Sequence, residues 1–200
     1  MKKQIRELDE RNVSIVSNNC VAGILYEWAG LRKQTPTAGI YFTGDSYRHF
    51  LDDLSKDRID EWSKLESANL VFKDDQGCWA LDRAAQGELV FLHYSSPDEA
   101  VTKWNRRMER LRGRTLLVIS SIRDQIARDP LMTVLTAFRF TFMVDGDTAP
   151  AADVLVLNSE FLRAFSRYVD QVINGAAERL ADEITIGGGA GFRIGRGTAP

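Results

Sequence analysis

The sequence predicts an α/β protein, a three-layer α/β/α domain around a largely parallel or mixed sheet. Three observations support this fold class. Short apolar runs alternate with amphipathic stretches of helical spacing, several of these runs are continuous as in strands covered on both faces, and 200 residues are enough for one well-buried core. We expect a single domain over residues 1–185 and a flexible, glycine-rich tail over residues 186–200.

The first third of the chain alternates strand and helix. The run VSIVS at 13–17 is β-branched and too short for a helix, which predicts a buried strand. A helix follows and ends at Gly30, a natural stop residue. Its helical spacing is carried by Val21, Ile24, Leu25 and Trp28. A second strand is predicted at 37–42, and Asp45 is placed to cap a helix that runs to about residue 55.

The rest of the chain continues this alternation. The clearest helix begins at Pro97, with Ser96 as N-cap, Glu99 completing a capping box and Gly113 as terminator. The other strands that we expect lie at 68–73, 88–94, 115–120, 138–144 and 152–157, and the other helices lie near 122–136 and from about 159 to 183.

Composition and charge exclude several classes of function. A hydrophobic fraction of 44% and a charged fraction of 27% are ordinary for a globular protein, and a formal net charge of -2 gives no overall attraction to nucleic acid. The longest apolar runs are far shorter than the roughly 20 residues that span a bilayer. The segment MKKQIRELDER has no apolar region behind its lysines, so it predicts no secretory signal. We therefore expect a cytoplasmic protein with no transmembrane segment and no nucleic-acid partner.

Cysteine and histidine are scarce. The chain contains two cysteines, Cys20 and Cys78, and two histidines, His49 and His93. Because no Cys-x-x-Cys pair occurs, neither a disulfide framework nor a conventional zinc site is indicated. We assign no metal site, and the sequence leaves the cofactor unknown. Chemistry at a single thiol remains open.

Cys20 follows a buried strand at the point where a helix begins. On the first turn of a helix, unpaired N–H groups and the helix dipole stabilise a thiolate, so Cys20 is a candidate nucleophile. Ser17, Asn18 and Asn19 precede it and can cap the helix or donate hydrogen bonds in a pocket. The alternative is that Cys20 is a small buried apolar residue, the commoner role of a lone cysteine.

His93 closes the strand predicted at 88–94, next to Tyr94. In a doubly wound sheet the carboxyl ends of the strands gather in one crevice, so we expect His93 and Cys20 to face the same cleft. A thiol and an imidazole in contact form a nucleophile and its general base. The alternative is a histidine that only makes a hydrogen bond at a strand end.

A third polar group, formed by Ser121, Arg123 and Asp124, follows the strand predicted at 115–120. Asp124 can orient the imidazole of His93, and Arg123 can bind an anionic group through two parallel hydrogen bonds. Equally, Arg123 and Asp124 can lie on a surface helix turn and contact only water.

The helix that begins at Pro97 carries a basic stripe opposite its apolar face. Its members are Lys103, Arg107, Arg110 and Arg114, flanked by Arg106 and Arg112. Such a stripe can hold phosphate or a polyanion, although most are simply solvated.

Four blocks of the sequence resemble a bacterial domain family of unknown function whose members are commonly labelled exopolysaccharide biosynthesis proteins. The blocks are VSIVSNNCVAGILYEWAGL, TPTAGIYFTGDSYRHFLDDL, ELVFLHYSSPDEAVTKWNRRMERL and SSIRD, and the resemblance covers roughly residues 12–145. The segment CWALDRAAQG and the C-terminal third depart from the family pattern. The resemblance implies a cytoplasmic α/β protein associated with surface-polysaccharide genes.

The residues and the resemblance together lead to one functional hypothesis. The protein is an enzyme of exopolysaccharide or capsule biosynthesis, a transferase that acts on an activated or acylated sugar precursor. Cys20 is the nucleophile, His93 the general base and Asp124 its orienting partner. The residues that we expect to bind a sugar or nucleotide-sugar precursor are Ser17, Asn18, Asn19, Asp45, Tyr94, Arg106, Arg107, Ser121 and Arg123.

Two alternatives stay open. One is a non-catalytic protein that uses the same crevice to bind a glycan or a protein partner, and thiol reactivity separates it from the transferase. The other is a glycosyltransferase that forms no covalent intermediate. That enzyme would bind a nucleotide sugar, with a metal, and would tolerate loss of Cys20.

Overall fold

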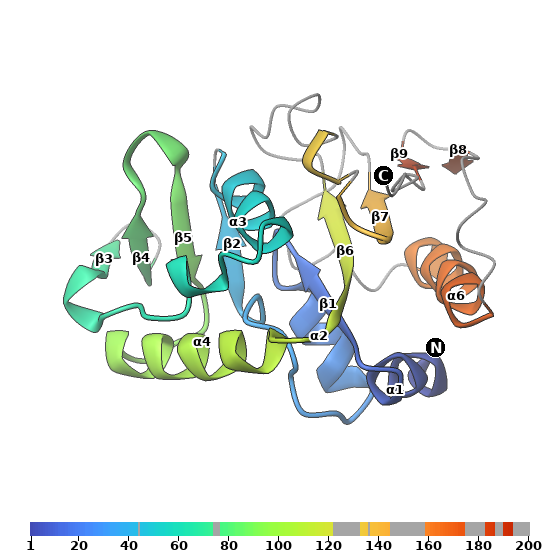
Figure 1. Cartoon of the computed structure of the whole chain (residues 1–200), viewed down its shortest axis with the longest axis horizontal. Helices are drawn as coiled ribbons and strands as arrows, with labels where there is room; N and C mark the ends of the chain where they lie inside the picture. The colour runs from blue at the N-terminus through green and yellow to red at the C-terminus, as the bar shows by residue number, and fades with distance from the viewer. Residues whose placement is uncertain are drawn as a thin grey trace.

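The computed structural model describes residues 1–43, 45–73, 77–121, 133–135, 137–144, 159–174, 183–186 and 190–193 (Figure 1). The described helices are α1 (Lys2–Glu10), α2 (Val21–Trp28), α3 (Ser46–Ser55), α4 (Pro97–Leu111) and α6 (Ser159–Ile173). The described strands are β1 (Val13–Ser17), β2 (Ile40–Phe42), β3 (Val71–Lys73), β4 (Cys78–Asp82), β5 (Glu88–Phe91), β6 (Thr115–Ser121), β7 (Phe140–Val144), β8 (Glu183–Ile186) and β9 (Ala190–Arg193). Short 3-10 helices lie at Ile59–Glu61, Ser67–Asn69 and Ala84–Gln86.

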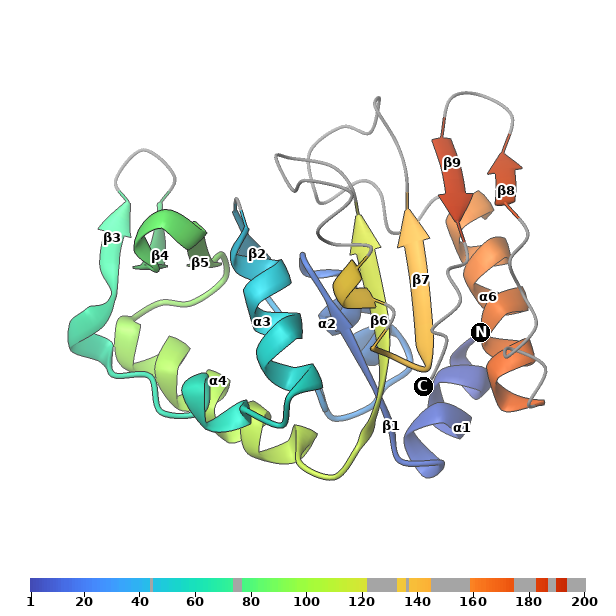
Figure 2. The same cartoon turned by 45° about the horizontal axis from the view of Figure 1, so that its top comes forward.

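The strands form two sheets that lie side by side across the molecule (Figures 1 and 2). One sheet has the order β1-β6-β7-β9-β8, in which β1, β6 and β7 are parallel while β9 and β8 are antiparallel to their neighbours. The other sheet, β2-β5-β4-β3, is antiparallel throughout. The α/β class that the sequence predicts is therefore confirmed.

The antiparallel sheet is inserted into the connection between β1 and β6. These two strands pair in parallel, with Ser17 opposite Ile119, so the chain between them is one long crossover. Two hydrogen bonds join the sheets near the end of β1. The Ser17 N–H donates to Thr37 Oγ1 (3.2 Å), and the Phe42 N–H donates to the Asn18 carbonyl (3.0 Å). The carboxyl end of β1 is therefore the seam between the two sheets.

Helices cover both faces of the mixed sheet (Figure 2). On one face, Ile15 of β1 and Phe142 of β7 pack with buried residues of α1, α2 and α6. On the opposite face, Val16 of β1 and Val118 of β6 join a core made with α3, α4 and the antiparallel sheet. Successive residues of β1 thus enter different cores, because side chains alternate between the two faces of a strand.

An N-cap fixes the start of α4, and Trp104 packs the helix against β5 and the segment around Trp62. Ser96 Oγ accepts a hydrogen bond from the Glu99 N–H (3.2 Å), and Pro97 is the first helical residue, as predicted. Trp104 is fully buried, and its indole N–H donates to the Trp62 carbonyl (2.5 Å). The aromatic rings that contact it are Phe50, Trp62 and Phe91. This packing fixes the position of the basic face of α4.

The predicted single sheet and the predicted strand at 88–94 differ from the structure. The sequence predicts one sheet, whereas two form, because β2 and β5 pair antiparallel and a run of apolar residues does not set the direction of its partner. The strand predicted at 88–94 ends at Phe91, so His93 lies in a turn.

The C-terminal part of the prediction is only partly covered by the described residues. The predicted helix at 122–136 is described only at 133–135, and the predicted strand at 152–157 lies outside the description. Helix α6 ends at Ile173, and β8 begins at Glu183, where the sequence predicts the end of that helix. Within the predicted tail, Ala190–Arg193 forms β9, which pairs with β7. The single domain over residues 1–185 stays a prediction.

Candidate functional site

The turn from β1 to α2 is built by capping hydrogen bonds. The Ser17 hydroxyl donates to the Asn19 carbonyl (2.6 Å) and accepts from the Ala22 N–H (3.0 Å), while Asn19 Oδ1 accepts from the Val21 N–H (3.1 Å). These bonds satisfy N–H groups that the first turn of a helix leaves without a partner. Ser17 and Asn19 therefore act as helix caps, one of the two roles that the sequence allows.

Cys20 lies immediately before the first residue of α2, with 3% of its surface exposed. It lines a cavity of about 300 Å³. Its neighbour Asn18 is also buried, and the Asn18 backbone carbonyl belongs to the seam between the sheets. Cys20 is thus a buried residue in the wall of a cavity.

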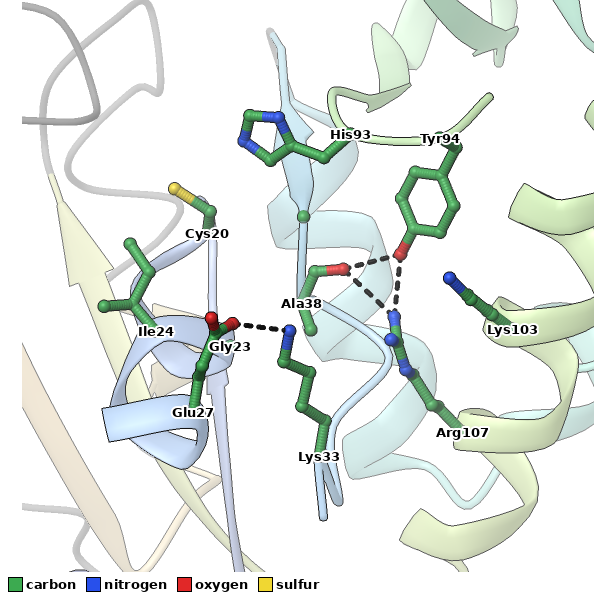
Figure 3. A pocket seen from close by; sticks show the side chains of 11 residues that line it. Cys20, Gly23, Ile24, Glu27, Lys33, Ala38, His93, Tyr94, Lys103 and Arg107 are labelled. Atoms are coloured by element: carbon green, nitrogen blue, oxygen red, sulfur yellow. Dashed lines mark hydrogen bonds and ion pairs between the residues drawn. The ribbon is translucent and has the colours of Figure 1, made fainter. Parts of the chain in front are cut away.

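The cavity lies at the seam, where α2, the turn at 37–39, the turn at 92–94 and α4 meet (Figure 3). The residues that line it are Cys20, Gly23, Ile24, Glu27, Lys33, Ala38, Gly39, His93, Tyr94, Lys103 and Arg107. In Figure 3 the imidazole of His93 extends toward the side on which Cys20 lies. The cationic groups of Lys33, Lys103 and Arg107 occupy the other side. The cavity therefore has a thiol–imidazole side and a cationic side.

His93 reaches the cavity through the antiparallel sheet. β5 runs opposite to β2, and the Leu92 N–H donates to the Gly39 carbonyl (3.0 Å), so the end of β5 lies beside the start of β2. His93 is exposed, whereas Cys20 is buried. The structure brings the two residues to one cavity, as the sequence predicts, but by a different route. They meet at the seam of two sheets and not in the crevice of one parallel sheet.

The Ala38 carbonyl, the Tyr94 hydroxyl and Arg107 Nη1 are joined pairwise by hydrogen bonds (Figure 3). The carbonyl accepts from the Tyr94 hydroxyl (2.6 Å) and from Arg107 Nη1 (3.0 Å), and Arg107 Nη1 also donates to the Tyr94 hydroxyl oxygen (2.7 Å). Burial raises the pKa of Tyr94, so the hydroxyl stays protonated and donates. Gly39 has a φ of 74°, a left-handed conformation that favours glycine. Tyr94 and Arg107 therefore fix the turn that forms one wall.

Ion pairs hold the lysines of the cavity. Lys33 Nζ lies 2.9 Å from Glu27 Oε2, and the hydrogen bond from Lys33 lowers the pKa of Glu27. Lys103 pairs with Glu99, and this contact, with hydrogen bonds from Ser95, lowers the pKa of Glu99 to about 2. Both carboxylates are therefore ionised at neutral pH.

Asp45 does not line the cavity. Its carboxylate forms an ion pair with Arg48 and makes no side-chain hydrogen bond to the start of α3. The Thr43 N–H donates to the carbonyl of Glu88, at the start of β5, whereas His93 follows the end of β5. Asp45 therefore lies at the opposite end of the β2–β5 pair from the candidate site.

The remaining predicted residues are distributed as follows. Arg106 is exposed on α4 and does not line the cavity, although its neighbour Arg107 does. Ser121 is the last residue of β6. Arg123 and Asp124 lie outside the described residues, so orientation of the imidazole by Asp124 stays a prediction.

Among the features that sequence reasoning missed are one charged pair in the lining and one acidic motif. Glu27 and Lys33 pair across a loop, which leaves no regular spacing to detect. Asp145 and Asp147 follow β7 directly in the chain as an Asp-x-Asp pair, a signal that the sequence does contain. They lie outside the described residues. Within the described part of the chain, no group of three or more His, Cys, Asp or Glu residues is placed to hold a metal ion.

The fold and the cavity together define an α/β protein with a small cationic pocket that contains a thiol and an imidazole. Residues 1–135 match the model of a family described as Domain of unknown function (DUF1919), and the chain belongs to this family. The matched segment includes all the residues that line the cavity. An uncharacterized protein of Haemophilus influenzae is 23% identical over 121 residues, which are 60% of this chain and 55% of the relative. The chain thus spans about half the length of this curated relative.

None of the described helices is both long enough and apolar enough to cross a membrane.

Proposed function

We propose that the protein is a transferase that acts on an activated or acylated sugar precursor, with Cys20 as the nucleophile and His93 as the general base. One observation carries this proposal. A thiol from the mixed-sheet side and an imidazole from the antiparallel sheet line a single cavity together with three cationic side chains. Its volume of about 300 Å³ is at the lower end of the roughly 300–1,000 Å³ of small-molecule sites.

The proposed reaction has two steps. The Cys20 thiol gives its proton to His93, and the sulfur attacks the electrophilic carbon of the donor. A sulfur–carbon bond forms, the bond from that carbon to the leaving group breaks, and the leaving group takes the proton from His93. An acceptor hydroxyl then gives its proton to His93 and attacks the same carbon. Cys20 departs as the thiolate and recovers the proton from His93.

The biological setting of the proposal is the assembly of exopolysaccharide or capsule. Its support is the resemblance of four sequence blocks to a family that carries the exopolysaccharide label. The lining also suits a hydroxylated ligand, since Tyr94, Glu27 and Lys33 supply donors and acceptors around the cavity.

Mass spectrometry of the intact protein and of its proteolytic peptides, after incubation with donors, tests the proposal. The donors are glucose 1-phosphate, UDP-glucose and acetyl coenzyme A, and the reaction is stopped with acid. We expect an adduct on the Cys20 peptide with one of them, absent in His93→Ala and absent from the Cys78 peptide. If Cys20→Ala consumes a donor as fast as the unaltered protein, no covalent step at Cys20 exists. A non-catalytic glycan-binding protein would consume none of the donors.

A second candidate is a glycosyltransferase that forms no covalent intermediate. The observation that favours it is the pair Asp145 and Asp147 directly after β7, since two carboxylates spaced in this way can ligate a divalent cation that binds a diphosphate. Hydrolysis of UDP-glucose in the presence of Mn²⁺ separates the two enzymes. The glycosyltransferase requires Asp145 and Asp147 and tolerates Cys20→Ala, and the Cys-dependent transferase shows the reverse.

A further inference from the structure

We propose that the cationic side of the cavity, formed by Lys33, Lys103 and Arg107, is a phosphate subsite and that its ligand is a phosphorylated monosaccharide. This proposal rests on the proposed function, because it names the group that activates the sugar. Of the two donor classes in the proposed function, the phosphate subsite favours the phosphorylated sugar and not the acylated one.

The charge of the lining favours a phosphate. Lys33, Lys103 and Arg107 bring three positive charges; Glu27 balances that of Lys33 and Glu99 that of Lys103, so Arg107 leaves a surplus of one positive charge. The whole chain, in contrast, has a formal net charge of -2. A phosphate monoester has three acceptor oxygens and close to two negative charges at neutral pH, so it can accept hydrogen bonds from all three cationic groups, whereas a carboxylate has two oxygens and one charge.

Arg107 is the central group of the subsite. Only 8% of its surface is exposed, and it donates hydrogen bonds to two neutral oxygens, the Ala38 carbonyl and the Tyr94 hydroxyl. Among the described residues, Arg107 forms an ion pair with no carboxylate. A buried cation without a counter-ion is costly, so an anionic ligand gains most where it meets this guanidinium.

Lys33 and Lys103 lie on two sides of the Arg107 guanidinium. Lys33 is held by Glu27, and Lys103 lies 5.7 Å from the centre of the Tyr94 ring. In Figure 3, Lys103 and Arg107 project from α4, and Lys33 lies beside Glu27 on the other side of Ala38, so the two lysines are ordered on opposite sides of the turn at 37–39. Ordered cations lose little conformational freedom when an anion binds.

The size of the cavity limits the ligand. A volume of about 300 Å³, at the lower limit for small-molecule sites, suits a single sugar ring with one phosphate better than a nucleotide sugar. Cys20 and His93 lie away from Lys103 and Arg107 (Figure 3), so a phosphate bound by these cations leaves the space beside Cys20 and His93 for the sugar ring.

Isothermal titration calorimetry with glucose 1-phosphate, glucose and UDP tests the subsite. We expect glucose 1-phosphate to bind more tightly than either of the other two. Arg107→Ala should weaken it at least about tenfold, because a charge-assisted hydrogen bond is lost. Arg106→Ala removes the same charge one residue away, outside the cavity, and should change the affinity less than about twofold.

Lys103→Gln is the second variant, since Arg107 also fixes the turn at 37–39, and near-ultraviolet circular dichroism checks that each variant folds. We expect Lys103→Gln to weaken glucose 1-phosphate at least about threefold. Equal losses in Arg106→Ala and Arg107→Ala, or tighter binding of UDP than of glucose 1-phosphate, would overturn the proposal. So would an unchanged affinity in Lys103→Gln.

Cys20→Ser separates the subsite from the transferase. It should abolish transfer while its affinity for glucose 1-phosphate stays within about twofold, because the thiol lies on the other side of the cavity. Binding of glucose 1-phosphate without any Cys20 adduct would support the phosphate subsite and contradict the covalent mechanism. A Cys20 adduct without binding of glucose 1-phosphate would support the covalent mechanism and contradict the subsite.

Discussion

The mixed sheet and the antiparallel sheet contribute to the cavity in opposite ways. From the end of β1 comes Cys20, buried behind a turn in which Ser17 and Asn19 already satisfy the first N–H groups of α2. From the antiparallel sheet and its helix α4 come an exposed His93 and the charged wall that includes Arg107. The site therefore belongs to the seam. The capped turn after β1 supplies the Cys20 thiol. The antiparallel sheet, with α4, supplies the cationic groups on that helix and the solvent-exposed imidazole of His93.

The largest expected effect comes from breaking the antiparallel side. Trp104 is fully buried and anchors α4 through rings of three neighbours and a hydrogen bond to the Trp62 carbonyl. Trp104→Ala should lower the free energy of unfolding by about 3–5 kcal/mol, measured by guanidinium denaturation. Phe72→Ala, at a position that is 45% exposed, is the control and should cost less than about 1 kcal/mol. Equal losses would contradict the anchoring role of Trp104.

The next effect comes from breaking the seam itself. A Cβ on Gly23 would lie 2.7 Å from the Ala38 Cα, so the turn at 37–39 must move away from α2. Gly23→Ala should therefore lower the free energy of unfolding by about 1–3 kcal/mol and also weaken binding of anions to the cavity. Thermal unfolding and calorimetry measure the two effects. Unchanged stability would mean that the two segments do not pack as closely as the structure shows.

A smaller loss is expected on the β1 side of the seam. Ser17→Ala removes a fully buried hydroxyl that bonds both the Asn19 carbonyl and the Ala22 N–H. We expect a loss of about 1–2 kcal/mol in urea denaturation. Ser55→Ala removes an exposed hydroxyl that bonds only a carbonyl of its own helix, and it should cost less than about 0.5 kcal/mol. If both variants lose the same amount, the cap does not stabilise the turn.

The smallest expected effect is the pH dependence of the stability that the Lys103–Glu99 ion pair of α4 contributes to the antiparallel side. Lys103 and Ser95 lower the pKa of Glu99 to about 2, from an ordinary value of 4.5. A lowered pKa stabilises the fold above the ordinary value, and this contribution is lost as the pH falls from about 4.5 to about 2. Glu99→Gln should therefore be less stable than the unaltered protein at pH 7, with a difference that shrinks across this window. A difference independent of pH would exclude the ion pair as its source.

The elements of the fold were predictable from local patterns, but their pairing was not. The β-branched run at 13–17 and the N-cap at Ser96 are encoded by adjacent residues, and the structure has both. The antiparallel direction of β5 depends on contacts with β2, far away in the chain, and the sequence carries no local mark of it. For this reason the sequence predicts one sheet where the structure has two.

The candidate site shows the same limit. The sequence singled out Cys20 and His93 by residue type and by position at the ends of elements, and Arg107 by the basic stripe on its helix, and all three line the cavity. Asp45 was predicted as a helix cap and through the second block of the family resemblance, yet it lies at the far end of the β2–β5 pair, because β5 runs antiparallel to β2. Lys33 was missed because a loop carries no periodic signal.

The central claim, that Cys20 and His93 act together, is tested most directly by the pH dependence of alkylation of Cys20 with iodoacetamide. Mass spectrometry follows the Cys20 peptide, with the buried Cys78 as internal control. We predict that Cys20 reacts with an apparent pKa clearly below about 8.5, that His93→Ala raises this value, and that Cys78 stays unreactive in the folded protein. A Cys20 that reacts only after unfolding, or a pKa that His93→Ala leaves unchanged, would contradict the claim.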